Sequence, residues 1–148
     1  MSSVLGKCLC GQIKFEISGP FPGIYQCHCS LCRRATGSAS NAALIVRREN
    51  FLWTRGREHI RSYRAENYRS DFCSRCDSPV PNPLADRPEY WVPAGSLEDH
   101  ADLEVAAHLH TASKAGWDAI APKGAQYREA PELDGLIEML HAHGRDRC

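Results

Sequence analysis

Seven of the eight cysteines stand in three tight clusters, and this spacing restricts the fold more than any other feature of the chain. The clusters are a first pair (Cys8 and Cys10), a triplet (Cys27, Cys29 and Cys32) and a second pair (Cys73 and Cys76). Thiols this close in sequence chelate a metal ion more readily than they form strain-free disulfides. The sequence therefore predicts a chain that folds around bound metal.

A disulfide scaffold is the main alternative for a short chain with this many cysteines. Residues 1–10 lack the apolar core of about 7 to 15 residues that an export signal contains. No segment reaches the roughly 18 apolar residues of a membrane helix. We therefore expect a soluble, cytoplasmic protein. Cys148, in a polar tail, is expected to be an unliganded thiol.

Chain length and net charge limit the number of domains and the classes of partner that we expect. A chain of 148 residues with 43% hydrophobic content predicts a single domain over residues 1–148, and its cysteine clusters suggest that this domain binds zinc. Lys plus Arg and Asp plus Glu each number 18, so the formal charge is zero. This balance gives no reason to expect nucleic acid or an anionic membrane as a partner. It leaves the oligomeric state open.

The cysteines must be divided among ions, and spacing alone permits more than one division. The two pairs together can supply the four ligands of a closed tetrahedral zinc site. The first pair can in principle combine with Cys27 and Cys29 instead. The contiguity of the triplet favours four plus three, which leaves the triplet one ligand short. Catalytic zinc sites keep such a position for water or substrate.

The second pair has a redox alternative, because Cys-x-x-Cys also occurs in thioredoxin-like proteins. That motif opens a helix, and Pro79, Pro81 and Pro83 cannot continue one. Turn-forming residues on both sides instead predict a zinc knuckle, in which backbone N–H groups face the sulfurs.

Alternating apolar residues predict a strand over Gly11–Ser18 that buries Ile13, Phe15 and Ile17. The first pair leads into it, so on an extended segment both thiols point the same way. Residues 33–41 are expected to form a loop or a short helical turn. Further strands are expected over residues 42–46, 50–54, 59–63, 68–72, 90–92 and 105–111.

One helix is expected near the C-terminal end, from an apolar stripe at helical spacing. The stripe consists of Leu133, Leu136, Ile137 and Leu140. Pro131 stands near its predicted start and Gly144 just past its predicted end, as helix termini prefer.

Two histidines and a tryptophan are further candidates for the site. His108 and His110 alternate with apolar residues, which predicts that both lie on one face of their strand. Either can close the triplet site as a fourth ligand, although packing or solvent exposure without a metal role is commoner. Trp117 is expected to be a core or edge anchor rather than a substrate platform.

Five motifs, taken in order, resemble the glutathione-dependent formaldehyde-activating enzyme and centromere protein V family, over nearly the whole chain up to Trp117. They lie at residues 6–11 with 13–16, 27–38, 72–78, 94–97, and 108–109 with 113–117. The resemblance implies a mainly β, Mss4-like fold of several small coiled antiparallel sheets around zinc sites, to which the pattern adds the C-terminal helix. It also implies two zinc ions per chain, a structural one on the two pairs and a second on the triplet.

The activity implied by the resemblance is that of a carbon–sulfur lyase joining glutathione and formaldehyde into S-hydroxymethylglutathione. The triplet is then the open, catalytic zinc site, and a small thiol such as glutathione is the partner. Arg33 and Arg34 either offset its negative charge or grip a carboxylate, or they simply face solvent. A non-catalytic, zinc-stabilised binding module is the alternative function.

The chain departs from the family pattern at Asp77, where the family usually has glycine. If this position needs a positive φ, aspartate can adopt it at some cost. Residues after Gly124 lie outside the match, so substrate-facing loops are free to differ.

Overall fold

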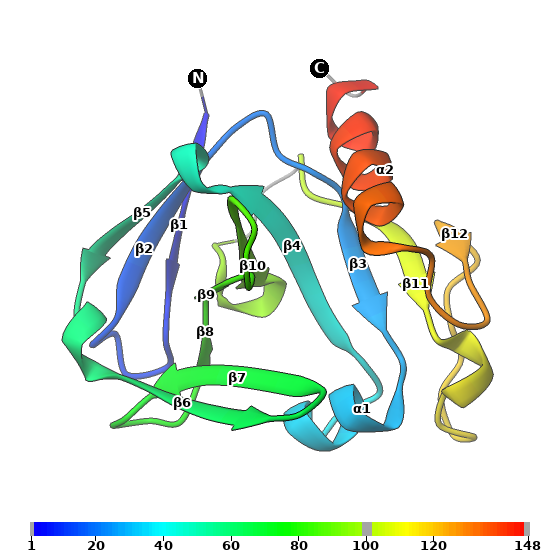
Figure 1. Cartoon of the computed structure of the whole chain (residues 1–148), viewed down its shortest axis with the longest axis horizontal. Coiled ribbons are helices and arrows are strands. Elements are labelled where there is room, and N and C mark those ends of the chain that lie inside the picture. Colours follow the sequence, from blue (N-terminus) through cyan, green and yellow to red (C-terminus); the bar gives the residue numbers. More distant parts are fainter. Residues whose placement is uncertain (1, 99–101, 147–148) are drawn as a thin grey trace. The chain divides into compact units, whose positions relative to one another are not determined.

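The computed structural model describes residues 2–98 and 102–146, and it is mainly β (Figure 1). Two compact units are present: Met1–Pro20 with Ile45–His100, and Phe21–Leu44 with Ala101–Cys148. The expectation of a single domain stays a prediction. Within the described ranges, no helix is both long and apolar enough to cross a membrane.

The first unit contains a three-stranded antiparallel sheet in the order β1-β2-β5. Its strands are β1 (Ser3–Lys7), β2 (Lys14–Ser18) and β5 (Phe51–Arg55). Alternation in β2 buries Phe15 and Ile17, as predicted, and the Phe15 ring stacks on that of Phe51 with centroids 5.6 Å apart. This packed face forms the apolar side of the sheet.

A second antiparallel sheet of the same unit carries the second cysteine pair. It consists of β6 (Ile60–Ala65), β7 (Tyr68–Cys73) and β8 (Pro79–Val80). As expected, most of β6 is exposed. Arg69 forms an ion pair at 3.0 Å with the buried Asp71. Strands β9 (Asn82–Pro83) and β10 (Glu89–Pro93) form a further antiparallel pair.

The second unit contains β3 (Ile24–Cys27), β11 (Val105–Leu109) and β12 (Ala125–Gln126). Here β11 pairs in parallel with both β3 and β12, whereas β3 pairs antiparallel with β4 (Asn41–Arg47). Parallel pairing differs from the purely antiparallel sheets expected, and the long chain between β3 and β11 permits it. The sheet places the end of β3 next to the end of β11.

Short helical elements complete the two units. The α-helices are α1 (Ser30–Thr36) and α2 (Leu133–Asp146), and single 3-10 turns span Arg48–Asn50, Arg57–His59, Ala94–Ser96 and Thr111–Ser113. The helix α1 occupies part of the segment expected to be a loop or short helical turn.

The helix α2 extends further than predicted, because Gly144 lies inside it rather than beyond its end. Leu136 and Leu140 are buried, as the apolar stripe requires, whereas Leu133 is 42% exposed. A Cβ on Gly144 would clash with the Phe21 carbonyl group. Glycine is therefore needed for the close approach of the helix to the chain, not for ending the helix.

Candidate metal centres

The two cysteine pairs converge in the first unit, where their sulfur atoms all lie within 4.8 Å of one another. We call this group the four-cysteine cluster. The Cys10 sulfur is 3.7 Å from that of Cys8 and 3.8 Å from that of Cys73. Zn–S bonds of about 2.3 Å in a tetrahedron place the sulfurs about 3.8 Å apart. The spacing therefore fits a closed tetrahedral thiolate site.

The first pair lies in a tight turn between β1 and β2, not on the extended segment that we expected. The Gly11 N–H donates to the Cys8 carbonyl at 3.1 Å, and Gly11 has a φ of 78°. The Cys8 N–H donates to the Ile13 carbonyl at 3.1 Å, and the Ile13 N–H donates to the Cys8 sulfur at 3.3 Å. The turn thus brings both thiols together and directs a backbone donor at one of them.

The second pair forms the predicted knuckle at the end of β7. The Arg75 N–H donates to the Cys73 sulfur at 3.4 Å. Asp77 has a positive φ, so the departure from the family's glycine falls at a position that does require this conformation. Ser78 accepts the Leu9 N–H at 2.9 Å and lies 3.2 Å from the Cys76 sulfur, which connects the two turns.

Opposite pKa shifts within the four-cysteine cluster reflect crowded thiols. Burial opposes ionisation of Cys76, but hydrogen bonds from Ser78 and Cys10 outweigh it and lower its pKa to about 6. A backbone hydrogen bond from Gln12 favours the Cys10 thiolate, yet burial and the neighbouring thiols together raise its pKa to about 11. Four thiolates at this spacing would repel one another, and a bound cation would offset that repulsion.

The triplet converges in the second unit, again with all sulfurs within 4.8 Å of one another. Cys27 ends β3, Cys29 is the N-cap of α1, and Cys32 lies in the first turn of that helix. The Cys32 N–H donates to the Cys29 sulfur at 3.4 Å. A strand end followed at once by a helix start therefore folds three thiols over one point.

The pKa values of two triplet thiols shift in opposite directions. A hydrogen bond from Cys32, opposed by burial, lowers the pKa of Cys27 to about 6. The same bond and burial raise the pKa of Cys32. A soft cation relieves this competition, since thiolates are ligands for zinc and similar metals. Within the described residues, no histidine or carboxylate joins either cluster.

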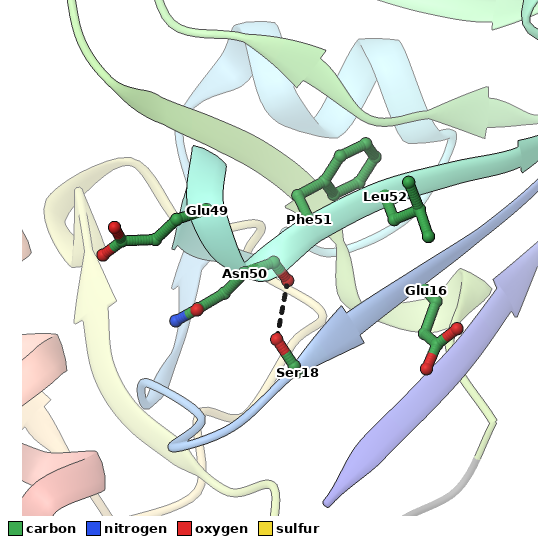
Figure 2. Close-up of a pocket in the computed structure, with 6 residues that line it drawn as sticks. All are labelled: Glu16, Ser18, Glu49, Asn50, Phe51 and Leu52. Atoms are coloured by element: carbon green, nitrogen blue, oxygen red, sulfur yellow. Dashed lines mark hydrogen bonds between the residues drawn. The ribbon is translucent and has the colours of Figure 1, made fainter. Parts of the chain in front are cut away.

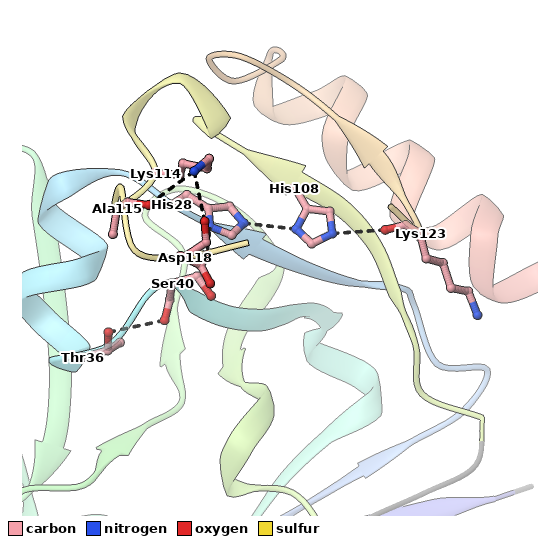
Figure 3. Close-up of polar contacts among 8 residues, drawn as sticks. All are labelled: His28, Thr36, Ser40, His108, Lys114, Ala115, Asp118 and Lys123. Carbon is pink, nitrogen blue, oxygen red and sulfur yellow. Dashed lines mark hydrogen bonds and ion pairs between the residues drawn. The ribbon is translucent and has the colours of Figure 1, made fainter. Parts of the chain in front are cut away.

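His28, between two members of the triplet, makes a buried contact that the sequence did not predict (Figure 3). Its Nε2 lies 3.1 Å from Nδ1 of His108, whose Nε2 lies 3.1 Å from the Lys123 carbonyl oxygen. Nδ1 of His28 faces Oδ2 of Asp118 at 3.9 Å. Burial and the neighbouring His108 lower the pKa of His28.

The expectation that His108 and His110 share a strand face was wrong. The strand β11 ends at Leu109, and His110 follows in a left-handed conformation with a φ of 55°. The strand period therefore does not apply to it. Both ring nitrogens of His108 already have partners. This disfavours closure of the triplet site by His108.

Arg33, Arg34 and Trp117 were the other side chains for which the sequence suggested a role. Arg34 is exposed, while Arg33 is partly buried with its Nε lacking a hydrogen-bond partner. Trp117, which we expected to be a core or edge anchor, lies in a turn and is 76% exposed, so the core position was wrong.

A surface pocket of about 320 Å³ in the first unit has a different chemistry (Figure 2). Its lining residues are Glu16, Ser18, Glu49, Asn50, Phe51 and Leu52. The Ser18 hydroxyl donates to the Asn50 carbonyl at 3.5 Å. With neither cysteine nor histidine in its lining, the pocket offers none of the soft ligands of the two clusters.

Comparison with known proteins relates the chain to one family. Residues 3–113 match the glutathione-dependent formaldehyde-activating enzyme family. A Halomonas elongata protein, whose provisional name is glutathione-dependent formaldehyde-activating enzyme, is 34% identical over 80 residues, which are 49% of this chain. The match spans about half of that relative, 51% of its length.

A solved structure supports the fold alone. The crystal structure of a Rhodobacter sphaeroides protein matches with a TM-score of 0.53 and 21% sequence identity. The match covers 83% of this chain and 98% of the other.

Proposed function

Because the chain belongs to the glutathione-dependent formaldehyde-activating enzyme family, we propose that it is a zinc-dependent, carbon–sulfur lyase-like enzyme acting on thiol–aldehyde adducts of the S-hydroxymethylglutathione type. The four-cysteine cluster holds a structural zinc ion. The triplet holds a second zinc ion and forms the catalytic site.

The observation that carries this proposal is the unequal number of thiols in two otherwise similar clusters. Four sulfurs converge in one cluster and three in the other. A tetrahedral zinc ion takes four ligands, and catalytic sites leave one for substrate. The difference supports a closed structural site and an open site that accepts a sulfur ligand.

The reaction needs a thiolate and a place for one proton. In the synthetic direction a C–S bond forms between thiol and aldehyde, and the thiol proton moves to the former carbonyl oxygen. In the reverse direction that hydroxyl loses its proton as the C–S bond breaks. A zinc ion bound to the triplet would lower the pKa of the substrate thiol.

The chain's own contribution is to prepare the ligands. The Cys32 N–H donates to the Cys29 sulfur and so stabilises charge on it, and the end of β3 and the start of α1 hold the three thiols together. Three thiolates around a divalent ion leave a formal charge of minus one. This makes the ion a weak Lewis acid but a good partner for sulfur.

Metal analysis of matched variants tests the two sites separately. We expect two zinc ions per wild-type chain, and one after Cys32→Ser or Cys73→Ser. Cys148→Ser, at a residue outside the described ranges, should retain both. One ion in the wild-type protein would contradict the two-site assignment.

Exchange of formaldehyde between its hydrate and S-hydroxymethylglutathione, measured by NMR, tests catalysis. Wild-type protein should accelerate exchange above the uncatalysed rate, and Cys32→Ser should remove the acceleration. Two bound zinc ions without acceleration would instead support the zinc-stabilised binding module.

A further inference from the structure

The contact between His28 and His108 joins residues that are 80 positions apart in the chain. Both side chains are almost fully buried, with 2% of each residue exposed. The backbone is joined at the same place, because the His28 N–H donates to the Leu109 carbonyl at 2.9 Å. The end of β11 therefore holds His28 by backbone and by side chain.

The Lys123 carbonyl oxygen determines which nitrogen donates in each of the two hydrogen bonds made by the histidine rings. A carbonyl oxygen only accepts, so His108 donates from Nε2 to Lys123 (Figure 3). A neutral His108 then presents the lone pair of Nδ1, and His28 donates to it from Nε2. Oδ2 of Asp118, at 3.9 Å from Nδ1 of His28, is beyond hydrogen-bond distance, so the Lys123 carbonyl selects the tautomer of both rings.

His28 lies between two cysteines of the triplet, so fixing its ring affects the backbone of the candidate metal site. It is the single residue between Cys27, which ends β3, and Cys29, which caps α1. A fixed ring restricts the backbone at the step from strand to helix. That step determines whether the three sulfurs converge.

We propose that His108 is a positioning residue for the metal site of the triplet and that it acts through His28. The inference rests on the proposed zinc site. His108 is not a ligand; it holds the segment between two ligands in the geometry that binds metal. Ordering the segment during folding leaves less to be ordered when the ion binds.

The test uses the full-length protein and three variants. His108→Leu removes the acceptor for His28 at similar bulk, whereas His108→Asn keeps an acceptor near the position of Nδ1. Lys123→Ala is the control, because His108 uses the backbone carbonyl of that residue. Zinc affinities come from competition with a chromophoric chelator, and cobalt charge-transfer intensity tells the three-thiolate site from the four-thiolate site.

We expect His108→Leu to weaken the three-thiolate site by about tenfold to a hundredfold and to leave the other unchanged. His108→Asn should recover most of this loss, and Lys123→Ala should match wild type. Nitrogen-15 NMR of the histidines should show the His28 proton on Nε2 in wild type and less on Nε2 in His108→Leu. Loss of zinc affinity in His108→Leu without this tautomer change would refute action through His28.

Other outcomes separate the two hypotheses. A wild-type protein with only one metal ion would overturn the proposed function. Two ions, with equal affinities in wild type and His108→Leu, would overturn the positioning role. If His108→Leu unfolds and loses both ions, two other measurements test the positioning role. A proton on Nδ1 of His28 in wild type would refute that role. A zinc affinity of His108→Asn no higher than that of a Cys29→Ser variant would also refute it.

Discussion

Asp77 donates its backbone N–H to the Cys73 carbonyl at 2.8 Å while holding a left-handed conformation with a φ of 63°. This closes the knuckle turn that presents the second pair. A side chain other than Gly, Asn or Asp pays about 1 to 2 kcal/mol for this conformation.

We therefore expect Asp77→Val to lower the free energy of unfolding by about 1 to 2 kcal/mol and Asp77→Asn to leave it nearly unchanged. Urea denaturation at saturating zinc measures both. Asparagine removes the charge but keeps the tolerance for positive φ. An equal loss in both variants would mean that the carboxylate, not the conformation, matters.

Gly144 and Gly135 predict opposite effects of the same substitution within α2. Gly144→Ala forces a Cβ against Phe21 and should destabilise the protein by about 1 to 3 kcal/mol. Gly135→Ala meets nothing within 4 Å and should stabilise it by about 0.5 to 1 kcal/mol through helix propensity. Thermal unfolding of the two variants provides the comparison. Equal stabilities would contradict the close packing at Gly144.

The Cys76 thiolate should depend on Ser78. In protein stripped of metal, alkylation of Cys76 should follow a pKa of about 6, and Ser78→Ala should move this pKa upward by removing a donor to the thiolate. Ser74→Ala, an exposed neighbour, is the matched control. Mass spectrometry of alkylated peptides across pH gives the midpoints.

The sign of the linked stability follows from the same shift. Folding lowers the pKa of Cys76 from an ordinary value of 9.0 to about 6. Its contribution is therefore present above the ordinary pKa and is lost as pH falls towards and through the folded value. An unchanged Cys76 midpoint in Ser78→Ala would contradict the assigned hydrogen bond.

Local periodicity predicted the parts of the fold that are governed by one buried face. Ile13, Phe15 and Ile17 are each at most 1% exposed, and Leu140 is fully buried, because strand and helix periods repeat along short segments. The grouping of cysteines followed from spacing and from a family resemblance, not from periodicity. It agrees with the two clusters in the structure.

The wrong predictions for the first cysteine pair and for His110 have the same physical cause, a reversal of the backbone. Gly11 turns the first pair out of the strand, and His110 leaves β11 through a left-handed residue. A strand period cannot reveal where such a reversal occurs. The contact of His28 with His108 was missed for another reason: it depends on parallel pairing of distant strands, for which neighbouring residues carry no signal.

The parallel pairing of β3 with β11 also has a consequence for the order of events during synthesis. At about 5 to 20 residues per second, the ribosome takes about 4 to 16 s to make the 80 residues that separate His28 from His108. For that interval the nascent triplet is without the strand that flanks it in the finished protein. The surroundings of this candidate metal site are therefore complete only when the C-terminal half of the chain has been made.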